Sequence, residues 1–266
     1  MLTQPLVIAR KELVDHARDV RSVALTALYS LMGPAVVLLA LLQRGAAAPA
    51  SGEGQPWPLM AAVFALMAAF TGSMAAAMDT IAGERERRSL VPLIVSSRSR
   101  RDLMIGKWMA LSLFSTIALA INIAAFGLVL ALPDAGRPVL SWLLLAPALL
   151  SLGLLAPACE ILISTICRST KEANTYVSLL VFGIMGVAMW TAFRADAGDR
   201  WSLLVPVLGQ QRLLEVGFSG SSSSVVELGL LGLQSLALTG ATALATIIVL
   251  AAASRLFQRD EAIYGG

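Results

Sequence analysis

Residues 79–107, DTIAGERERRSLVPLIVSSRSRRDLMIGK, form a strongly charged stretch between two long apolar runs. The stretch holds 7 of the 20 lysine and arginine residues of the chain within 29 positions. Apolar runs on both sides of so much charge indicate two membrane-spanning helices that are joined by a polar connection at the membrane surface. The fold then depends on how many further apolar runs of similar length the chain contains.

The composition is that of a protein embedded in a lipid bilayer. Of the 266 residues, 57% are hydrophobic and 14% are charged, and the mean hydropathy is +0.77. Soluble domains have about 25% charged residues. The sequence therefore predicts an all-α integral membrane protein with several spans. No basic face on a soluble domain is present, so nucleic acid is not an expected partner.

Six apolar runs are long enough to cross about 30 Å of hydrocarbon as helices. They cover residues 22–43, 58–78, 106–132, 142–166, 176–193 and 225–254. A further apolar segment, residues 201–218, is interrupted by Pro206, Gly209 and Arg212. Because unsatisfied backbone groups cannot face lipid, this segment is predicted to be a short external re-entrant or interfacial segment before the last span.

The N-terminal segment, residues 1–21, has the pattern of an amphipathic helix. Leu6, Leu13 and Val14 belong to an apolar stripe, whereas the opposite side is charged. The charged residues of interest there are Arg10, Lys11, Glu12 and Arg18. This pattern predicts a helix that lies in the membrane interface, and the alternative is a disordered charged tail.

The distribution of positive charge predicts the orientation. The segments 1–21, 79–107 and 168–175 and the C-terminal tail together hold 15 lysine and arginine residues, whereas the remaining three connections hold 5. Positive charge marks the cytoplasmic side of membrane proteins. Both termini and residues 79–105 are therefore predicted to be cytoplasmic.

Motifs for enzymatic chemistry are missing from the sequence. It has no G-x-x-x-x-G-K-[ST], no G-x-S-x-G and no H-E-x-x-H, so it is not expected to be an enzyme or to hydrolyse ATP itself. Two cysteines, Cys159 and Cys167, and a single histidine are too few for a zinc site. No metal or other cofactor is expected in this chain.

Two polar residues inside the predicted spans are candidates for a functional role. Glu160 is an intramembrane carboxylate, which is costly and therefore marks a candidate functional site. The alternatives are that Glu160 pairs with a cytoplasmic arginine or caps backbone groups that are freed by Pro157. Asn122 is expected to form a hydrogen bond between helices rather than to bind a ligand.

The charged stretch also contains an apolar segment, residues 90–95. A merely solvated connection would not need these side chains, so they are expected either in the membrane interface or in a groove of a partner protein. After them, Ser99 is expected to cap the next helix, whose first turn contains Asp102. The stretch is thus a candidate coupling segment that includes a short cytoplasmic helix.

Several motifs resemble those of the permease subunits of ABC-2-type exporters, notably the sodium-efflux branch. The pattern G-E-x-E-x-x-S-L-x-x-L, followed by S-R-x-x-[LI]-x-x-G-K, is carried here by Gly83, Glu84, Glu86, Ser89, Leu90 and Leu93, then by Ser99, Arg100, Leu103, Gly106 and Lys107. The start of the chain, with Arg10, Lys11 and Glu12, is similar as well. The connection 168–175 resembles the second cytoplasmic connection of the family.

The resemblance implies one transmembrane domain over residues 1–266, in a bacterial or archaeal cytoplasmic membrane. It implies a second permease copy or a homologous permease, and separate ATP-binding subunits that carry ATP and magnesium and drive export. The residues implied in coupling are Gly83, Glu84, Arg85, Glu86, Arg87, Ser89, Leu90 and Leu93, with Arg168, Lys171 and Glu172 in the second connection. Charge reversal at Glu84, Glu86 or Arg87 is expected to uncouple transport without preventing membrane insertion.

The substrate is not indicated by the sequence. The first external connection has about 14 residues, which is short for the sodium-efflux branch, and Val91 stands where the family often has glutamate. A membrane-embedded assembly or anchoring protein is the alternative function. A secondary transporter is disfavoured because the sequence has no internal repeat and little charge inside the spans.

Overall fold

The computed structural model describes residues 3–44, 57–89, 99–131, 139–193, 204–219 and 225–258. Within these ranges the chain is helical and contains no strand, which confirms the predicted all-α class. Six helices or helical runs are long and apolar enough to cross a membrane, as predicted. The protein is therefore a multi-pass membrane protein.

The spans are formed by the following elements. The first is α2 (Val20–Arg44), and the second is α3 (Trp57–Thr71) continued by α4 (Met74–Met78), the π-helical turn η1 (Asp79–Gly83) and α5 (Glu84–Glu86). The others are α7 (Arg100–Ala131), α8 (Val139–Ile166), α9 (Thr170–Phe193) and α11 (Val225–Phe257). Two shorter helices, α1 (Thr3–Arg18) and α10 (Leu208–Ser219), complete the described chain.

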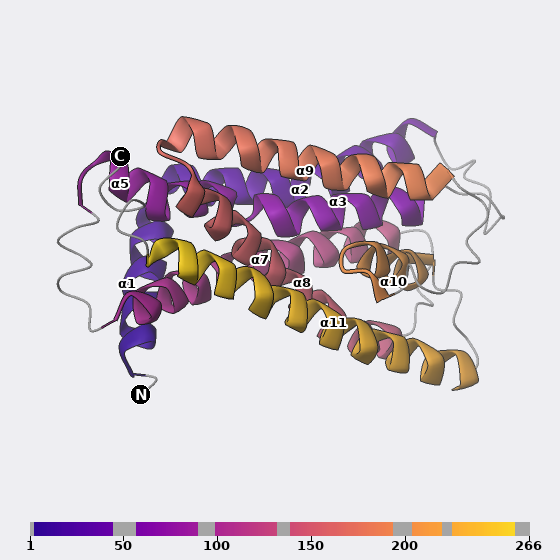
Figure 1. Ribbon diagram of the computed structural model, residues 1–266. Helices are drawn as coiled ribbons and strands as arrows, with labels where there is room; N and C mark the ends of the chain where they lie inside the picture. The colour runs from indigo at the N-terminus through magenta and orange to yellow at the C-terminus, as the bar shows by residue number, and fades with distance from the viewer. Residues whose placement is uncertain are drawn as a thin grey trace.

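The long helices run side by side in one bundle, and the two shorter helices lie at its opposite ends (Figure 1). The helix α1 crosses one end of the bundle, where α5 and the end of α11 also lie, whereas α10 lies toward the other end (Figure 1). In the second and fourth spans 67% of the apolar window is buried, against 22% in the fifth and sixth. The second and fourth spans therefore form the centre of the bundle.

Small residues allow the central helices to approach closely. The buried alanines of α3 include Ala61, Ala65 and Ala68, and none of their surface is exposed. A side-chain carbon placed on Gly72 would lie 2.3 Å from Cβ of Ala118 in α7, so only glycine fits at this crossing. Because lipid provides no hydrophobic driving force between helices, such close packing is a main source of their association.

The second span is broken in the middle and is longer than predicted. The helix α3 ends at Thr71, and α4 begins two residues after Gly72. The Thr26 hydroxyl donates to the Gly72 carbonyl (2.8 Å), and the Ser115 hydroxyl donates to the Ala69 carbonyl (2.6 Å). These side chains satisfy backbone groups near the break, as a bilayer interior requires.

The boundary of the second span at the charged end of the bundle differs from the prediction. The sequence predicts that the second span ends at Met78, but the helical run continues through η1 and α5 to Glu86. Ile81, Ala82 and Gly83 are buried in the bundle, so the first part of the charged stretch is packed structure rather than a connection. The helix α7 begins at Arg100, and Ser99 Oγ accepts a hydrogen bond from the Asp102 amide (3.0 Å), which confirms the predicted cap.

Three of the remaining spans begin earlier than the apolar runs predict. The helix α2 starts at Val20, α8 at Val139 and α9 at Thr170, each a few residues before the predicted span, whereas α11 starts at Val225 as predicted. The predicted apolar segment 90–95 and most of the connection between the first two spans lie outside the described residues. Of the predicted segment 201–218, residues 204–218 are described, and α10 accounts for its second half.

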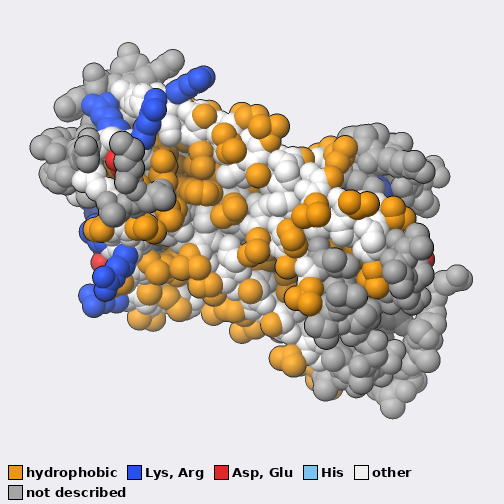
Figure 2. Space-filling model, turned by 90° about the horizontal axis from the view of Figure 1, so that it is seen from below, with side chains coloured by type: hydrophobic (Ala, Val, Ile, Leu, Met, Phe, Trp, Pro, Cys, Tyr) orange, Lys and Arg blue, Asp and Glu red, His pale blue; other side chains and the backbone are white. Residues whose placement is uncertain are grey.

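The outer surface has the pattern of a membrane protein. Figure 2 shows hydrophobic side chains over the length of the bundle and lysine and arginine side chains gathered at one end. Exposed apolar residues occur on α2, α9 and α11, among them Leu39, Phe182 and Ile247. Apolar side chains that face outward along the whole length of these helices fit contact with lipid.

Candidate functional site

A buried ammonium group lies at the centre of the charged end of the bundle. Lys107, about two turns into α7, has only 1% of its side chain exposed. Its Nζ lies 2.8 Å from Glu84 Oε1 in α5, 3.2 Å from Glu12 Oε1 in α1 and 3.1 Å from the Thr80 carbonyl in η1. The three donors of the ammonium therefore have three acceptors. A buried charge requires such pairing.

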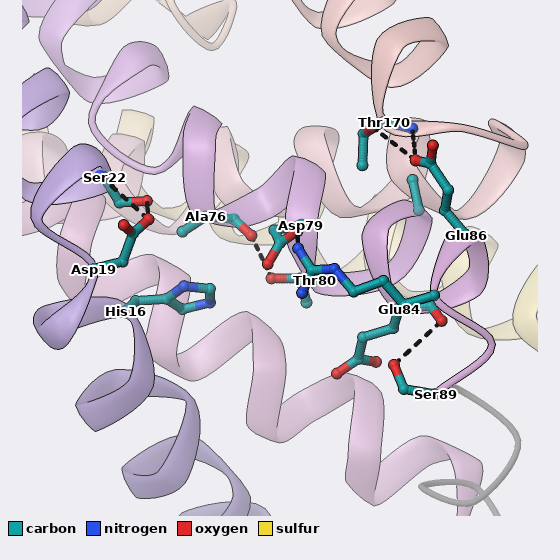
Figure 3. Close-up of polar contacts among 12 residues, drawn as sticks. His16, Asp19, Ser22, Ala76, Asp79, Thr80, Glu84, Glu86, Ser89 and Thr170 are labelled. Carbon is teal, nitrogen blue, oxygen red and sulfur yellow. Dashed lines mark hydrogen bonds and ion pairs between the residues drawn. The ribbon is translucent and has the colours of Figure 1, made fainter.

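The single histidine of the chain lies beside this ammonium cluster. His16 is buried in α1, and its Nε2 lies 3.7 Å from Glu12 Oε2. Its ring packs edge-on against Phe114 of α7, with a centroid distance of 6.1 Å. Figure 3 shows the ring pointing from α1 toward the turn that contains Asp79 and Thr80. Burial lowers the pKa of His16 below its ordinary value of 6.5, so the ring is neutral at pH 7.

Arg85 and Glu86, which follow Glu84 in the charged stretch, bind the ends of two other helices. Arg85 donates to the Thr165 carbonyl (3.1 Å), in the last turn of α8, and to the carbonyl of Cys167, the residue after that helix. Glu86 Oε2 accepts from the Thr170 amide (3.2 Å) and the Thr170 hydroxyl (2.8 Å) at the start of α9 (Figure 3). A cation at a helix C-terminus and an anion at an N-terminus both suit the helix dipoles.

The other predicted coupling residues have different surroundings. Gly83 is buried, and Ser89 Oγ donates to the Glu84 carbonyl (3.3 Å; Figure 3). Arg87 is exposed and forms an ion pair with Asp79. Leu90 and Leu93 lie outside the described residues. The charged stretch thus has one set of side chains that holds the bundle together and another that is exposed.

The predicted residues of the N-terminal segment divide in the same way. Arg10, Lys11 and Arg18 are exposed on α1, whereas Glu12 points inward and is 6% exposed. Lys11 also lies near Asp15, at 3.6 Å. The inward position of Glu12 explains how α1 contributes to the ammonium cluster while its cationic side chains stay on the surface.

The second connection forms a compact cap for α9. Ser169 Oγ accepts from the Glu172 amide (3.2 Å), and Glu172 Oε2 accepts from the Arg168 amide (2.8 Å). This reciprocal arrangement is close to a capping box. The Lys171 side chain is exposed, as is that of Arg168. The cap and Glu86 together fix the start of α9 against α5.

A second polar feature lies deeper in the bundle. Glu160 of α8 is fully buried, and its Oε2 accepts a hydrogen bond from Ser73 Oγ (2.7 Å) at the break between α3 and α4. The other oxygen, Oε1, has no hydrogen-bond partner among the described residues. Asn122 is also buried and donates to the Ser30 carbonyl of α2 (2.8 Å), which is the hydrogen bond between helices that the sequence predicts.

Comparison with known proteins places this architecture in a family. The profile of the ABC-2 family transporter proteins matches residues 6–262. The chain belongs to this family. Its resemblance to ABC-2 permeases, inferred from the motifs of residues 83–107, is thereby confirmed.

One relative of this ABC-2 protein is the ABC transporter permease protein NatB of Bacillus subtilis (strain 168). The two are 33% identical over an alignment of 128 positions, and the match covers 42% of this chain and 31% of the relative. The matched region thus spans about a third of the length of that relative. Family membership supports a transmembrane permease subunit of an ABC transporter rather than an enzyme.

Two residues of the site in this ABC-2 protein received no role from the sequence. Lys107 counted only as part of a motif at the start of a span, and His16 only as part of an amphipathic segment. The signal for Lys107 is that an ammonium group follows Leu103, Met104 and Ile105 inside a helix that continues into an apolar run. Polar groups at such positions need a partner inside the bundle. No comparable signal marks His16.

Proposed function

We propose that this chain is the permease subunit of an ATP-driven exporter, in which a separate ATP-binding subunit binds ATP and magnesium and supplies the free energy. Family membership supports this proposal, and the sequence contains no P-loop of its own. Two permeases, either identical or homologous, would form the membrane domain. The chain would lie in a bacterial or archaeal cytoplasmic membrane with both termini inside.

The observation that carries the proposal is the convergence of α1, α5, α7 and the α8–α9 turn at one charged end. Glu12, Glu84, Arg85 and Glu86 connect these elements through the contacts described above. A partner that displaces α1 or residues 79–105 would therefore act on three spans at once. We propose that α1 lies in the membrane interface and that the exposed residues of this end, including Arg87 and Lys171, face the ATP-binding subunit.

For transport, the ATP-binding subunit must bias two conformations that bind the substrate differently. The chain's contribution is to convert a displacement at its cytoplasmic end into movement of α7, α8 and α9. Because Glu160 lies at the centre of the bundle, beside the break in the second span, it is the residue that we propose for a role in the transport pathway. The bond to Ser73 connects the two central spans at that point.

The proposal is tested by purification of the tagged chain from its native membrane. We expect an ATP-binding subunit to co-purify and its ATPase activity to change when the permease is present in the same membrane vesicle. Purification without any ATP-binding subunit, under conditions that preserve a known ABC complex, would instead favour the assembly or anchoring function.

Orientation requires a separate test. In a variant that lacks Cys159 and Cys167, a membrane-impermeant maleimide should modify Leu204→Cys on intact cells but modify Lys171→Cys only in inside-out vesicles. Both positions are chosen because they are exposed and lie on either side of the membrane in the proposed orientation. Labelling of Lys171→Cys on intact cells would reverse the assignment.

A further inference from the structure

The Lys107 ammonium is a single point at which three separate segments of the cytoplasmic end meet. It contacts Glu12 of α1, Thr80 of η1 and Glu84 of α5, which are separated from it by 95, 27 and 23 positions. Lys107 itself belongs to α7. The ammonium thus connects the N-terminal helix and the end of the second span to the start of the third.

The helix α1 lies directly against the backbone of α7 at this point. A side-chain carbon on Gly106 would lie 2.7 Å from Cβ of Ile8 and 2.8 Å from the carbonyl of Pro5, so the residue before Lys107 leaves room only for glycine. This close approach brings Glu12 within reach of Lys107. The contact is therefore a fitted interface between α1 and α7 and not a flexible surface ion pair.

The residues that follow Glu84 extend the connection to the opposite side. Arg85 binds carbonyls at the end of α8, and Glu86 binds the start of α9. In addition, Ser164 Oγ of α8 accepts a hydrogen bond from the Ala82 amide of η1 (3.1 Å). Glu84, Arg85 and Glu86 therefore hold α5 against α7, α8 and α9, respectively. Lys107 also binds Glu12 and so attaches α1 to the same group of helices.

Because the charges are buried, it is costly for one helix to leave the cluster of Lys107, Glu12 and Glu84 while the others stay in place. If α1 or α5 moved away alone, a buried ammonium or carboxylate would lose its partner in a site from which water is largely excluded. Movement of all the connected elements together leaves every pair intact. The cluster thus favours displacement as one unit over independent displacement of its parts.

We propose that Lys107 is a positioning residue that locks α1 and residues 79–89 to the start of α7, so that they move as one rigid unit with the α8–α9 turn when an ATP-binding subunit acts on this end. The proposal rests on the proposed function for the source of the displacement. The lock itself is a property of the chain alone. Glu84 then serves inside the permease and not in the contact with the partner.

The test uses a variant in which the whole cluster is neutral, Glu12→Gln with Glu84→Gln and Lys107→Met. Lys107→Met alone would leave the buried Glu12 and the half-buried Glu84 without their cation and is expected to reduce the yield of folded protein. Replacement of a complete buried ionic cluster by neutral residues of similar volume is commonly tolerated. The control is Lys11→Met, because Lys11 lies 3.7 Å from the same Glu12 Oε1 but is exposed.

Spin labels at the exposed positions Arg10 in α1 and Asn174 in α9 report the distance across the unit, in full-length protein that lacks Cys159 and Cys167. Without nucleotide, we expect one narrow distance distribution in the otherwise unmodified protein and in Lys11→Met, and a broadened one in the neutral variant. This nucleotide-free measurement does not require the ATP-binding subunit. A narrow distribution in a neutral variant with unchanged melting temperature would overturn the proposal.

In the complex with the ATP-binding subunit, addition of ATP and vanadate should leave the narrow distribution in place in the otherwise unmodified protein. In the neutral variant it should shift the distribution, with loss of the effect of the permease on ATPase activity. A nucleotide-dependent shift in the otherwise unmodified protein would overturn the rigid unit. If no ATP-binding subunit co-purifies, the proposed function fails, whereas the nucleotide-free arm still decides the role of Lys107.

Discussion

Ser73 and Glu160 form a buried hydrogen bond between the two central spans, with 2.7 Å between Ser73 Oγ and Glu160 Oε2. The sequence suggested a cytoplasmic arginine, or backbone freed by Pro157, as the partner of this carboxylate. The structure gives it a hydroxyl partner instead. Ser73 is placed there because α3 ends at Thr71 and the chain re-enters a helix at α4, so the polar pair lies at the break in the second span.

Glu160→Gln removes the ionisable group of this side chain and keeps its shape. The amide oxygen still accepts the hydrogen bond from Ser73, so we expect a melting temperature close to that of the unmodified protein. We expect transport to be impaired, because the carboxylate is lost at the centre of the bundle. The measurement is transport by the reconstituted complex, together with a thermal melt of the same protein. Normal transport with a lowered melting temperature would indicate a structural role.

The matched control for this pair is Ser73→Ala. It removes one buried hydrogen bond, which in membrane proteins contributes about 0.6 kcal/mol on average. We expect a small decrease in melting temperature. Because the carboxylate remains, transport should be less affected than in Glu160→Gln. Equal loss of transport in both variants would assign the effect to the bond between the spans and not to the carboxylate.

Charge reversal at Glu84 and at Glu86 should have different results. The sequence predicts that both variants insert normally, but Glu84 is only 17% exposed and is paired with buried Lys107, so this expectation changes for Glu84. Glu84→Lys places two ammonium groups together, and loss of a buried partner costs about 3–5 kcal/mol. We expect little folded Glu84→Lys protein in the membrane.

Glu86→Lys is expected to insert and to remain folded, because Glu86 is exposed. Loss of its contact with Thr170 should lower the stability only slightly, because solvent screens an exposed contact. We expect weaker coupling to the ATP-binding subunit, measured as ATPase activity of the purified complex. The comparison uses size-exclusion profiles and yields of both variants. Similar yields for Glu84→Lys and Glu86→Lys would contradict the burial argument.

His16 should make stability dependent on pH on the acidic side. Burial lowers the pKa of His16 below 6.5, whereas Glu12, Asp79 and Asp15 act in the opposite direction and Lys107 acts in the same direction as burial. The unfolded chain therefore binds this proton at a higher pH than the folded protein. The free energy of unfolding should fall as the pH drops through 6.5, by at most about 1.4 kcal/mol per pH unit, until the lower folded pKa is reached.

The pH dependence is measured by melting temperatures of the purified protein between about pH 8 and about pH 5.5. Each value is compared with that of His16→Gln, which is not ionisable. The difference between the two proteins should be constant above pH 7 and should change below it. A difference that stays constant over the whole range would show that His16 is not held neutral by the fold.

Gln210 should be the residue that fixes α10 at the far end of the bundle. Its Nε2 donates to Thr242 Oγ1 of α11 (2.8 Å), and its Oε1 accepts from the Val207 amide at the start of α10. Gln210→Leu leaves the amide without this partner, so we expect a loss of about 1–3 kcal/mol in stability. The control is Gln234→Leu on the exposed side of α11, which should change the stability by less than about 0.5 kcal/mol.

The sequence predicted the number of spans because the signal for a span is local. About 20 apolar residues in succession are sufficient to indicate a helix that crosses lipid, whatever its neighbours are. The cap at Ser99 was also predictable, since it depends on residues within one turn. In contrast, the end of the second span at Glu86 was missed, because buried neighbours in α8 and α9 extend that helix beyond its apolar run.

The sequence by itself thus determined the all-α class, the six spans and the charged end of this ABC-2 protein, through hydropathy, charge and short motifs. Only the tertiary structure decided which charges are structural. Glu84 and Glu86 are two positions apart in one motif, yet one is half-buried and paired with buried Lys107, and the other caps α9 at the surface. The physical reason is that pairing of a charge depends on partners up to 95 positions away, which no local pattern specifies.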